Sequence, residues 1–286
     1  MEDFINKAKI LLETLPYIKE FYNQIMVIKI GGEPMISEVI KKNIGLDLVL
    51  MRYVGIKPVV VHGGGKQITE LMHKLNKKSI FIDGLRVTDK ETMNITEMVL
   101  TGMINKELVG IINQEGGNAV GISGRDANLI VSEKLKSKNK TDYGYVGKIV
   151  KVNPEIILSL IDNNFIPVIS PVGTSIKGEA YNINADTAAS AIASALKAAK
   201  LLILTDVRGI YREVNNENSF IPTIKREELK KLIDKKIITG GMLPKVEACI
   251  KALEKGVKKT HIIDGRIPHS LILEIFTEAG VGTEIV

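Results

Sequence analysis

The feature that most constrains the fold is a short apolar run at residues 58–61 that ends in His62 and three consecutive glycines. A stretch with helical spacing follows at about residues 66–75. An earlier apolar run at residues 25–30 also ends in a pair of glycines and precedes a helical stretch. This repeated order of strand, glycine turn and helix predicts a parallel α/β sheet. Both glycine turns should then lie at the carboxyl ends of strands, where ligands bind in such sheets.

The alternation of strands and helices returns in the last third of the chain, after a less regular middle. Apolar strand-like runs occur at residues 165–169, 201–205 and 260–263, and an alanine-rich helix is expected from residue 185. We therefore expect a three-layer αβα sandwich around a largely parallel central sheet, in two lobes. The expected segments are an N-terminal helix over residues 1–24, an N-lobe over 25–175 and a C-lobe over 176–286.

An amphipathic helix is predicted over residues 2–22. Its apolar residues recur at steps of three or four and would form one stripe. Pro16 should kink or divide this helix. Two alternatives remain for the stripe: it lies against its own domain, or it packs against another subunit. The stripe consists of Phe4, Ala8, Leu11, Leu15, Ile18 and Tyr22.

Composition limits the class of protein. A chain of 286 residues can bury a large core without a disulfide, and Cys249, as the only cysteine, excludes an internal disulfide and a cysteine-based zinc site. The net charge of +6 is scattered and is not interleaved with aromatic residues, so nucleic-acid binding is not expected. Glu2 and Asp3 open the chain and no long apolar run follows. We expect no targeting segment, no membrane association and a reducing, cytoplasmic location.

The two glycine turns predict anion binding. Lys29 stands just before Gly31 and Gly32, although a surface lysine after a strand is an equally good interpretation of that turn alone. The three glycines after His62 would let a ligand approach the amide groups at a helix N-terminus. A Walker P-loop would need a glycine where Val60 stands. The second turn therefore suits a phosphate or a carboxylate, but not by that device.

Three further motifs stand at expected ends of strands or starts of helices. Asp186 follows Asn182 and Asn184 at the start of the alanine-rich helix, where helix capping is the alternative explanation. Residues 205–211 follow an apolar strand and so lie at a typical ligand rim. Lys245 follows a glycine pair at the start of another helix, where a lysine is electrostatically unfavourable unless an anion binds there.

Together these motifs resemble the amino acid kinase family. The resemblance runs from about residue 25 to the C-terminus and rests on the order KIGG, VHGGG, DGLRVTD, NINADTAA, LTDVRGIY and TGGMLPK. Within the family, the DGLRVTD and NINAD segments resemble the members that phosphorylate N-acetyl-L-glutamate in arginine biosynthesis. They are less similar to the members that act on uridylate, aspartate or carbamate.

The resemblance implies a role for each matching residue. Lys29 and Lys245 would stabilise the transferring phosphoryl group, and Asp186 would orient both lysines. Acceptor binding would fall to the N-lobe, which would also form a dimer, whereas the C-lobe would bind ATP and an effector. The acceptor residues would be Gly64, Gly65, Arg86 and Asn182, with Arg86 pairing to a substrate carboxylate. The phosphoryl and ATP contacts would be Gly31, Gly32, Asp206, Val207, Gly209, Ile210, Tyr211, Ile237, Ile238 and Thr239.

The residue types fit this chemistry independently. A side-chain carboxylate has a reference pKa near 4, so it is ionised at neutral pH and needs no general base to attack a phosphate. Such a site needs positive charge and amide donors, which the motifs supply. Mg²⁺ would arrive bound to the ATP phosphates, and no compact carboxylate cluster predicts a separate metal site.

The resemblance also implies regulation. Family members with an extra N-terminal helix are typically arginine-inhibited ring hexamers, trimers of dimers joined through those helices. The C-terminal part of the chain resembles these arginine-sensitive members, with His261 and Glu274 as effector contacts. The alternatives are a polar residue at the start of a buried strand for His261 and an exposed helix position for Glu274.

Two rival functions remain. An acetylated or carrier-bound aminoadipate is one methylene longer than the expected acceptor, and one methylene discriminates by only about 1–3 kcal/mol. A non-catalytic amino acid sensor with the same fold would be expected to lose the phosphoryl-transfer residues. Lys29, Asp186 and Lys245 are all present.

Overall fold

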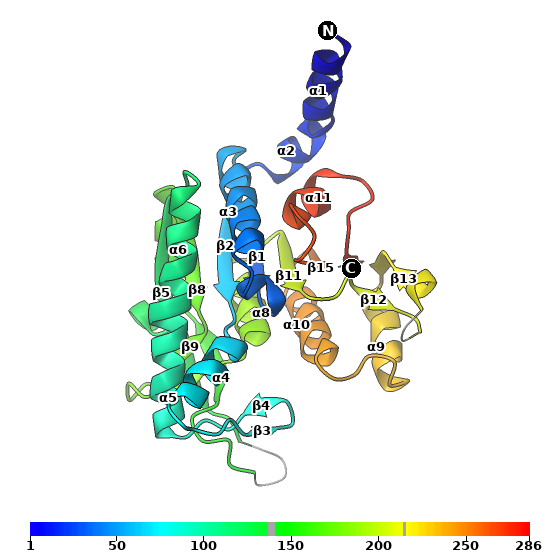
Figure 1. Cartoon of the computed structure of the whole chain (residues 1–286). Helices are drawn as coiled ribbons and strands as arrows, with labels where there is room; N and C mark the ends of the chain where they lie inside the picture. The colour runs from blue at the N-terminus through cyan, green and yellow to red at the C-terminus, as the bar shows by residue number, and fades with distance from the viewer. Residues whose placement is uncertain (137–140, 214–215) are drawn as a thin grey trace.

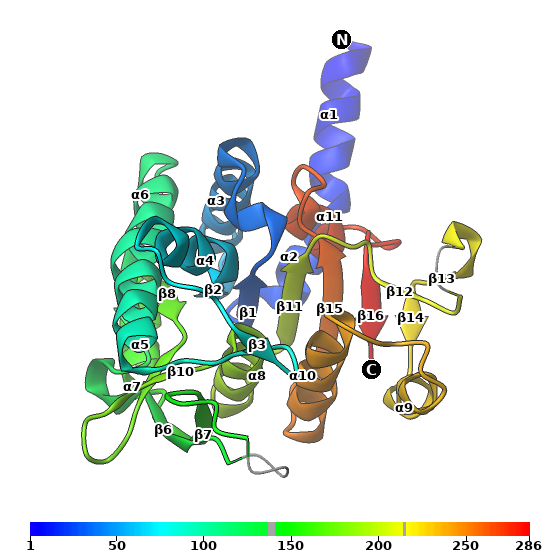
Figure 2. The same cartoon turned by 60° about the horizontal axis from the view of Figure 1, so that its bottom comes forward.

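A single large sheet runs through the molecule. The computed structural model describes residues 1–136, 141–213 and 216–286. The strands of this sheet are β1 (Ile25–Ile30), β2 (Lys57–His62), β5 (Ala119–Ser123), β8 (Ile166–Ser170), β11 (Lys200–Thr205), β14 (Thr223–Ile224), β15 (Lys259–Asp264) and β16 (Thr283–Ile285). Their order is β14-β16-β15-β11-β1-β2-β8-β5, and the strands from β14 to β8 can be followed side by side in Figure 2. Only the β15–β16 pair is antiparallel among these described strands, which confirms the largely parallel sheet.

Helices cover both faces of this sheet, so the expected three layers are confirmed (Figure 1). One core takes side chains from α7 (Glu155–Asp162), α8 (Ala185–Ala195), α9 (Arg226–Asp234) and α10 (Met242–Glu254). The other takes side chains from α3 (Glu38–Tyr53), α4 (Gly65–Lys74), α5 (Lys90–Glu97), α6 (Asn105–Gln114) and α11 (Ser270–Phe276). Successive residues of β1 alternate between the two cores, with Val27 in the first and Met26 and Ile28 in the second. Lys29 therefore points to the same face as Val27, toward α8.

A smaller four-stranded sheet, in the order β10-β9-β6-β7, lies beside α8. Its strands are β6 (Ile130–Lys134), β7 (Gly147–Val152), β9 (Val172–Thr174) and β10 (Ala180–Asn182). β10 follows the expected boundary at residue 175 yet pairs with β9, which precedes it. The lobe limits stay a prediction. The remaining paired strands form two antiparallel hairpins, β3 (Phe81–Ile82) with β4 (Leu85–Arg86), and β12 (Ile210–Tyr211) with β13 (Phe220–Ile221).

The connection between α5 and α6 is itself helical. A π-helical segment, η2 (Met98–Ile104), joins them without a break. A π turn holds one more residue per turn than an α turn, and such segments are frequent at functional sites. Short 3₁₀ turns occur at η1 (Glu33–Met35), η3 (Asp126–Asn128) and η4 (Glu217–Ser219).

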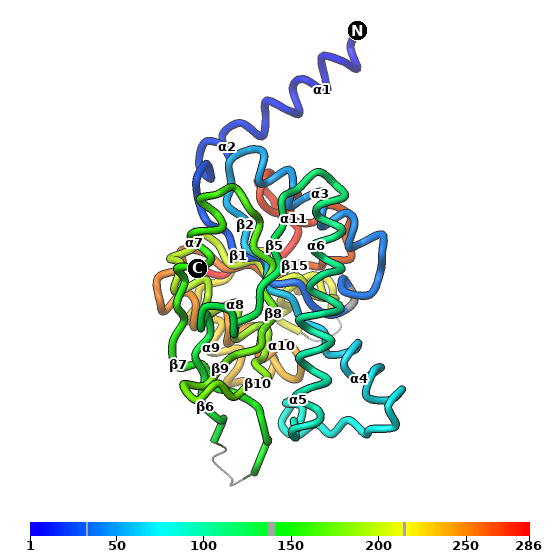
Figure 3. The backbone as a smooth tube through the Cα atoms, turned by 90° about the vertical axis from the view of Figure 1, so that its left-hand side faces the viewer, coloured from blue at the N-terminus to red at the C-terminus, as the bar shows by residue number. Residues whose placement is uncertain are grey.

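The N-terminal segment is not one helix. It forms α1 (Glu2–Glu13) and α2 (Leu15–Phe21), divided at Thr14, with Pro16 in the first turn of α2, where proline is tolerated. α1 extends away from the body and has no buried residue (Figures 1 and 3). α2 packs on the sheet through Phe21, which is 6% exposed. Within the single chain, α1 does not lie against its own domain, which contradicts the first alternative for residues 2–13.

The two glycine turns meet at the carboxyl edge of the central sheet. β1 and β2 are neighbours, and the amide of Gly63 donates a hydrogen bond to the carbonyl of Ile30 (2.8 Å). β11 pairs with the other side of β1, so the order of the strands reverses at this point. Ligands bind at such a reversal in open α/β sheets.

The single cysteine belongs to the interior. Cys249 lies on the sheet-facing side of α10 and is completely buried. Burial raises the pKa of its thiol to about 12.

Candidate active site

Two lysines from distant parts of the chain share one carboxylate. Lys29 Nζ lies 2.8 Å from Asp186 Oδ1, and Lys245 Nζ lies 3.8 Å from Asp186 Oδ2. Lys29 comes from β1, Asp186 from the first turn of α8 and Lys245 from the first turn of α10. Lys29 and Asp186 are each only 5% exposed. The three residues that the sequence analysis singled out therefore form one cluster.

Helix capping explains Asn184 but not Asp186. Asn184 Oδ1 accepts a hydrogen bond from the amide of Thr187 (3.0 Å) and closes the start of α8. This leaves the Asp186 carboxylate for the two lysines. Lys245 also donates to the carbonyl of Gly241 (3.1 Å) in the turn that opens α10.

Asp186 remains ionised in this environment. Burial alone would raise the pKa of Asp186, but the charges of Lys29 and Lys245 and their hydrogen bonds outweigh burial. The pKa therefore lies below its ordinary value. The cluster carries two positive charges and one negative charge, so an excess positive charge faces any anion bound beside it.

The first glycine pair is required by this cluster. A Cβ atom on Gly31 would lie 2.2 Å from Lys29 Nζ, because the lysine side chain passes over that residue. Gly32 has a φ of +72°, in the left-handed region that favours glycine. It lies next to Asp206, whose carboxyl carbon would be 3.8 Å from a Cβ at position 32.

A cavity of about 200 Å³ opens beside the cluster, and we call it the acceptor pocket. It brings together every residue that was predicted to bind the acceptor and two members of the cluster. Sequence reasoning missed most of its apolar wall, because apolar residues near a motif do not differ in pattern from ordinary core residues. The predicted residues in its lining are Lys29, Gly64, Gly65, Arg86, Asn182 and Asp186, and the missed apolar ones include Ile68, Leu85, Leu100, Val146, Pro171 and Ile183.

Arg86 is fixed at the wall of the acceptor pocket. Its guanidinium donates to the Gly65 carbonyl, Thr69 Oγ1 and Ser79 Oγ at 2.7 to 2.8 Å, and lies 4.6 Å from the centre of the Phe81 ring. Burial lowers the pKa of Arg86, although the group stays charged at any physiological pH. The side chain is therefore a preorganised cation that projects from the β3–β4 hairpin.

Asn182 and the second glycine turn complete the acceptor pocket. The side-chain Nδ2 of Asn182 donates to Thr88 Oγ1 (3.2 Å), and the backbone amide of Asn182 donates to the carbonyl of Tyr145 (2.8 Å). α4 begins at Gly65, so the free amide groups of its first turn lie at the pocket. These amides and Arg86 are suited to bind carboxylate oxygen atoms.

A second cavity, of about 540 Å³, contains nearly all the residues that were predicted to contact the nucleotide. Met242 of its wall belongs to the first turn of α10, which also carries Lys245. Asp206 is not part of the cavity wall and lies next to Gly32 instead. Met242, Asn216 and Glu217 were missed. The predicted residues in the wall are Val207, Gly209, Ile210, Tyr211, Ile237, Ile238 and Thr239.

His261 and Glu274 lie in a third cavity, of about 240 Å³. His261 Nδ1 is 2.7 Å from Glu274 Oε1, and the amides of Val281 and Gly282 donate to Glu274 Oε2. Glu274 is 7% exposed, so the alternative of an exposed helix position is wrong. Its side chain is buried because α11 is short and packs between α2, α3 and β15.

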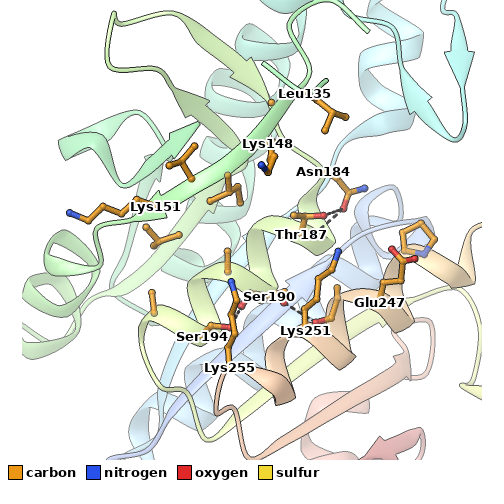
Figure 4. Close-up of a pocket in the computed structure, with 18 of the residues that line it drawn as sticks. Leu135, Lys148, Lys151, Asn184, Thr187, Ser190, Ser194, Glu247, Lys251 and Lys255 are labelled. Carbon is orange, nitrogen blue, oxygen red and sulfur yellow. Dashed lines mark hydrogen bonds between the residues drawn. The ribbon is translucent and has the colours of Figure 1, made fainter. Parts of the chain in front are cut away.

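A groove of about 810 Å³, larger than the three cavities above, contains none of the predicted site residues (Figure 4). It runs along β7 and across α8 to α10. Lys148 and Lys151 from β7, Lys251 from α10 and Lys255, which follows the last residue of α10, stand along it. Leu85, Val146 and Asn184 line both the groove and the acceptor pocket, so these residues form a thin wall between the two.

Two general features of the described residues bear on the class of protein. No group of three or more His, Cys, Asp or Glu side chains among residues 1–136, 141–213 and 216–286 could hold a metal ion. No described helix combines the length and the apolar character that a membrane span requires.

Comparison with known proteins gives a consistent result. The model of the amino acid kinase family matches residues 24–264. An acetylglutamate kinase from Carboxydothermus hydrogenoformans is 54% identical over 99% of both chains. Another, from Caldanaerobacter subterraneus subsp. tengcongensis, is 55% identical and covers 99% of this chain and 94% of its own.

Solved structures share the fold. A protein from Streptococcus mutans superimposes with a TM-score of 0.76 at 31% identity, over 92% of this chain and 98% of its own. N-acetylglutamate synthase from Neisseria gonorrhoeae, complexed with coenzyme A and N-acetyl-glutamate, gives a TM-score of 0.85 at 24% identity over 98% of this chain. This chain spans 63% of the length of that synthase chain, and the likeness concerns the fold alone.

The fold, the lysine cluster and these relatives together define the class: this chain belongs to the amino acid kinase family. It is an enzyme, a phosphotransferase that uses a carboxyl group as acceptor and ATP as phosphate donor.

Proposed function

We propose that this enzyme phosphorylates the side-chain carboxylate of N-acetyl-L-glutamate with ATP, giving N-acetylglutamyl 5-phosphate in arginine biosynthesis. The observation that carries the proposal is the position of the lysine cluster. Lys29 and Asp186 line the acceptor pocket, whereas α10 brings Lys245 to Asp186 and Met242 to the second cavity. Full-length relatives that are acetylglutamate kinases support the choice of acceptor.

The chemistry requires positive charge rather than a base. The acceptor carboxylate is ionised at neutral pH, so its oxygen attacks the γ-phosphorus directly. The bond from that phosphorus to the bridging oxygen breaks, and ADP leaves with the electron pair. Lys29 and Lys245 offset the negative charge on the phosphoryl oxygens, and Gly32 donates its amide to the same group. Asp186 acts by positioning the two lysines.

The acceptor is held at its other end. Arg86 pairs with the backbone carboxylate of N-acetyl-L-glutamate, because it is the buried cation of the pocket that does not belong to the lysine cluster. Gly64 and Gly65 offer amides, and Asn182 offers its side-chain amide to the acetylamino group. With both ends held, the reacting oxygen is oriented toward the lysines, which supplies part of the rate enhancement.

ATP occupies the second cavity in this proposal. Val207, Ile210 and Ile237 offer apolar surface to the base, while residues 206–211 follow the carboxyl end of β11. Mg²⁺ would arrive bound to the nucleotide and would offset part of the negative charge of the phosphates. The N-lobe, residues 25–175, then holds most of the acceptor side and the C-lobe, residues 176–286, holds the donor side.

We also propose feedback inhibition by arginine in the third cavity. Four glutamates line it, namely Glu20, Glu274, Glu278 and Glu284, against two lysines, so the cavity favours a cationic ligand. His261 Nε2 has no hydrogen-bond partner among the described residues and can accept one from a guanidinium.

The N-terminal arm connects this inhibition to assembly. Tyr17, Glu20 and Phe21 of α2 form one wall of the third cavity. The apolar side chains of α1 are exposed, with Phe4 71% and Leu11 72% exposed, and they suit a second copy of the same helix. We propose a ring hexamer, a trimer of dimers, joined through α1.

The test of the main proposal is ATP consumption with N-acetyl-L-glutamate, with hydroxylamine added to trap the acyl phosphate. We expect a hydroxamate in amounts equal to the ADP formed. Turnover with an acetylated or carrier-bound aminoadipate but not with acetylglutamate would replace the acceptor. No acyl hydroxamate with either acceptor would overturn the function.

A further inference from the structure

The π-helical segment η2 places two apolar side chains against the second glycine turn. A Cβ atom on Gly64 would lie 2.3 Å from Ile104 Cδ1 and 2.7 Å from Leu100 Cδ2. Both side chains are buried, at 1% and 2% exposure. A side chain at position 64 would therefore displace the ends of these two side chains.

The two side chains differ in what else they contact. Leu100 lines the acceptor pocket, whereas Ile104 does not. Leu100 is thus the part of η2 that a bound acceptor would touch. Residues 100 and 104 are four positions apart in one continuous helical segment, so their side chains lie on the same face.

Leu100 is more deeply buried than the apolar wall that Leu85 and Val146 form. Leu85 and Val146 separate the acceptor pocket from the groove of about 810 Å³, so they can yield toward open space. Leu100 is backed by the packed side chains of η2 and by the backbone of Gly64. A close-packed wall does not move to admit an extra methylene without cost.

The charged groups of the pocket fix the ends of an acceptor. The lining contains Arg86 from the β3–β4 hairpin and, from β1 and α8, the Lys29–Asp186 pair. An acceptor with one more methylene must fold that excess length into the apolar part of a cavity of only about 200 Å³. The position of the close-packed wall therefore decides which chain length is accommodated.

We propose that Leu100 determines the acceptor length, by excluding N-acylated dicarboxylic amino acids that are one methylene longer than N-acetyl-L-glutamate. This inference rests on the proposed function. It assigns to η2 a role in specificity rather than in the chemical step.

The experiment compares two acceptors in three purified full-length proteins. The ratio of kcat/KM for N-acetyl-L-glutamate to that for N-acetyl-L-2-aminoadipate is measured by hydroxamate formation in the wild type, Leu100→Ala and Ile104→Ala. We expect Leu100→Ala to lower this ratio at least tenfold. One methylene in an apolar pocket usually changes kcat/KM by about 10–200-fold. Ile104→Ala removes similar volume beside the same glycine and should leave the ratio unchanged.

The ratio separates specificity from stability, because a smaller folded fraction lowers both kcat/KM values equally. If Leu100→Ala does not fold, Leu100→Val gives a smaller shift in the same direction. An equal ratio in all folded variants would overturn the inference. A wild type that phosphorylates neither acceptor would instead overturn the proposed function.

Discussion

Two buried carboxylates, Asp186 and Glu274, are held in different ways. Asp186 lies between two lysines, one from β1 and one from α10. Glu274 pairs with a histidine and with the amides of Val281 and Gly282 in its own C-terminal segment. The first carboxylate joins distant elements of the core, whereas the second belongs to a local arrangement beside the N-terminal arm.

The difference separates a fixed charge arrangement from an adjustable one. The pKa of Asp186 lies below its ordinary value, so this carboxylate keeps its charge at every physiological pH. The pocket of Glu274 contains an imidazole and takes one wall from α2, which precedes the central sheet. A catalytic site benefits from rigidity and a regulatory site from parts that can move or titrate.

The largest expected effect concerns the lysine cluster. Lys245→Ala should lower kcat by about 10²–10³-fold, because it removes a charge that faces the transferring phosphoryl group. The dissociation constant for N-acetyl-L-glutamate, measured by calorimetry, should stay close to that of the wild type. Lys251→Ala, on the same helix but facing the groove, is the matched control. A loss confined to acetylglutamate affinity would contradict the role of Lys245.

A second experiment tests the proposed roles of α1 and of the third cavity separately. Deletion of residues 1–13 removes α1 alone and should reduce the particle size in light scattering, while the wall contributed by α2 remains. Deletion of residues 1–22 also removes Tyr17, Glu20 and Phe21, and should therefore weaken arginine inhibition further. Both proteins should keep the turnover of the wild type without arginine. An unchanged particle size for both deletions would exclude assembly through α1.

The smallest effect concerns pH. Burial lowers the pKa of His261 below that of an unfolded histidine, near 6.5, although Glu274 partly opposes the shift. Between the two pKa values only the unfolded state binds the proton, so the free energy of unfolding falls as the pH is lowered from 7 to 5. His261→Gln should reduce this slope by at most about 1.4 kcal/mol per pH unit in urea titrations.

Other titrating groups act in the same range and define the control. Burial lowers the pKa of His62 to about 4, which gives the same sign as His261. Burial raises the pKa of Asp47 to about 6, which gives the opposite sign. Both remain in the variant, so only part of the slope should disappear. His73→Gln, at an exposed position of α4, should keep the slope of the wild type, and an equal loss in both variants would refute the assignment to His261.

The sequence predicted the layers and the central cluster because both depend on local patterns. Apolar runs that end in glycine place Lys29 and Gly64 at one edge of a parallel sheet, whatever the connecting helices do. The lysine at the start of α10 was informative because its position is unfavourable without an anion. The structure brings Lys29, Asp186 and Lys245 together as expected, while their roles in phosphoryl transfer stay predictions.

The parts that the sequence did not predict depend on packing at a distance. Glu274 is buried because α11 lies between other elements. Nothing in the sequence of the seven residues of α11 indicates that burial. The π-helical form of residues 98–104 has no simple sequence signal, because its side chains look like those of an α-helix. The groove lies between β7, α8 and α10. Its existence depends on how far apart these three elements lie, and a local sequence pattern does not predict that distance.

The buried thiol of Cys249 has a practical consequence. A thiol with a pKa near 12 and no exposure hardly reacts with maleimides at neutral pH, since the thiolate is the reactive form. A cysteine introduced at any exposed position would therefore be the only site of labelling, with no need to remove the native one. Pairs of such labels, one on the β3–β4 hairpin and one on α9, would measure by fluorescence transfer whether the distance between these two elements changes when substrates bind.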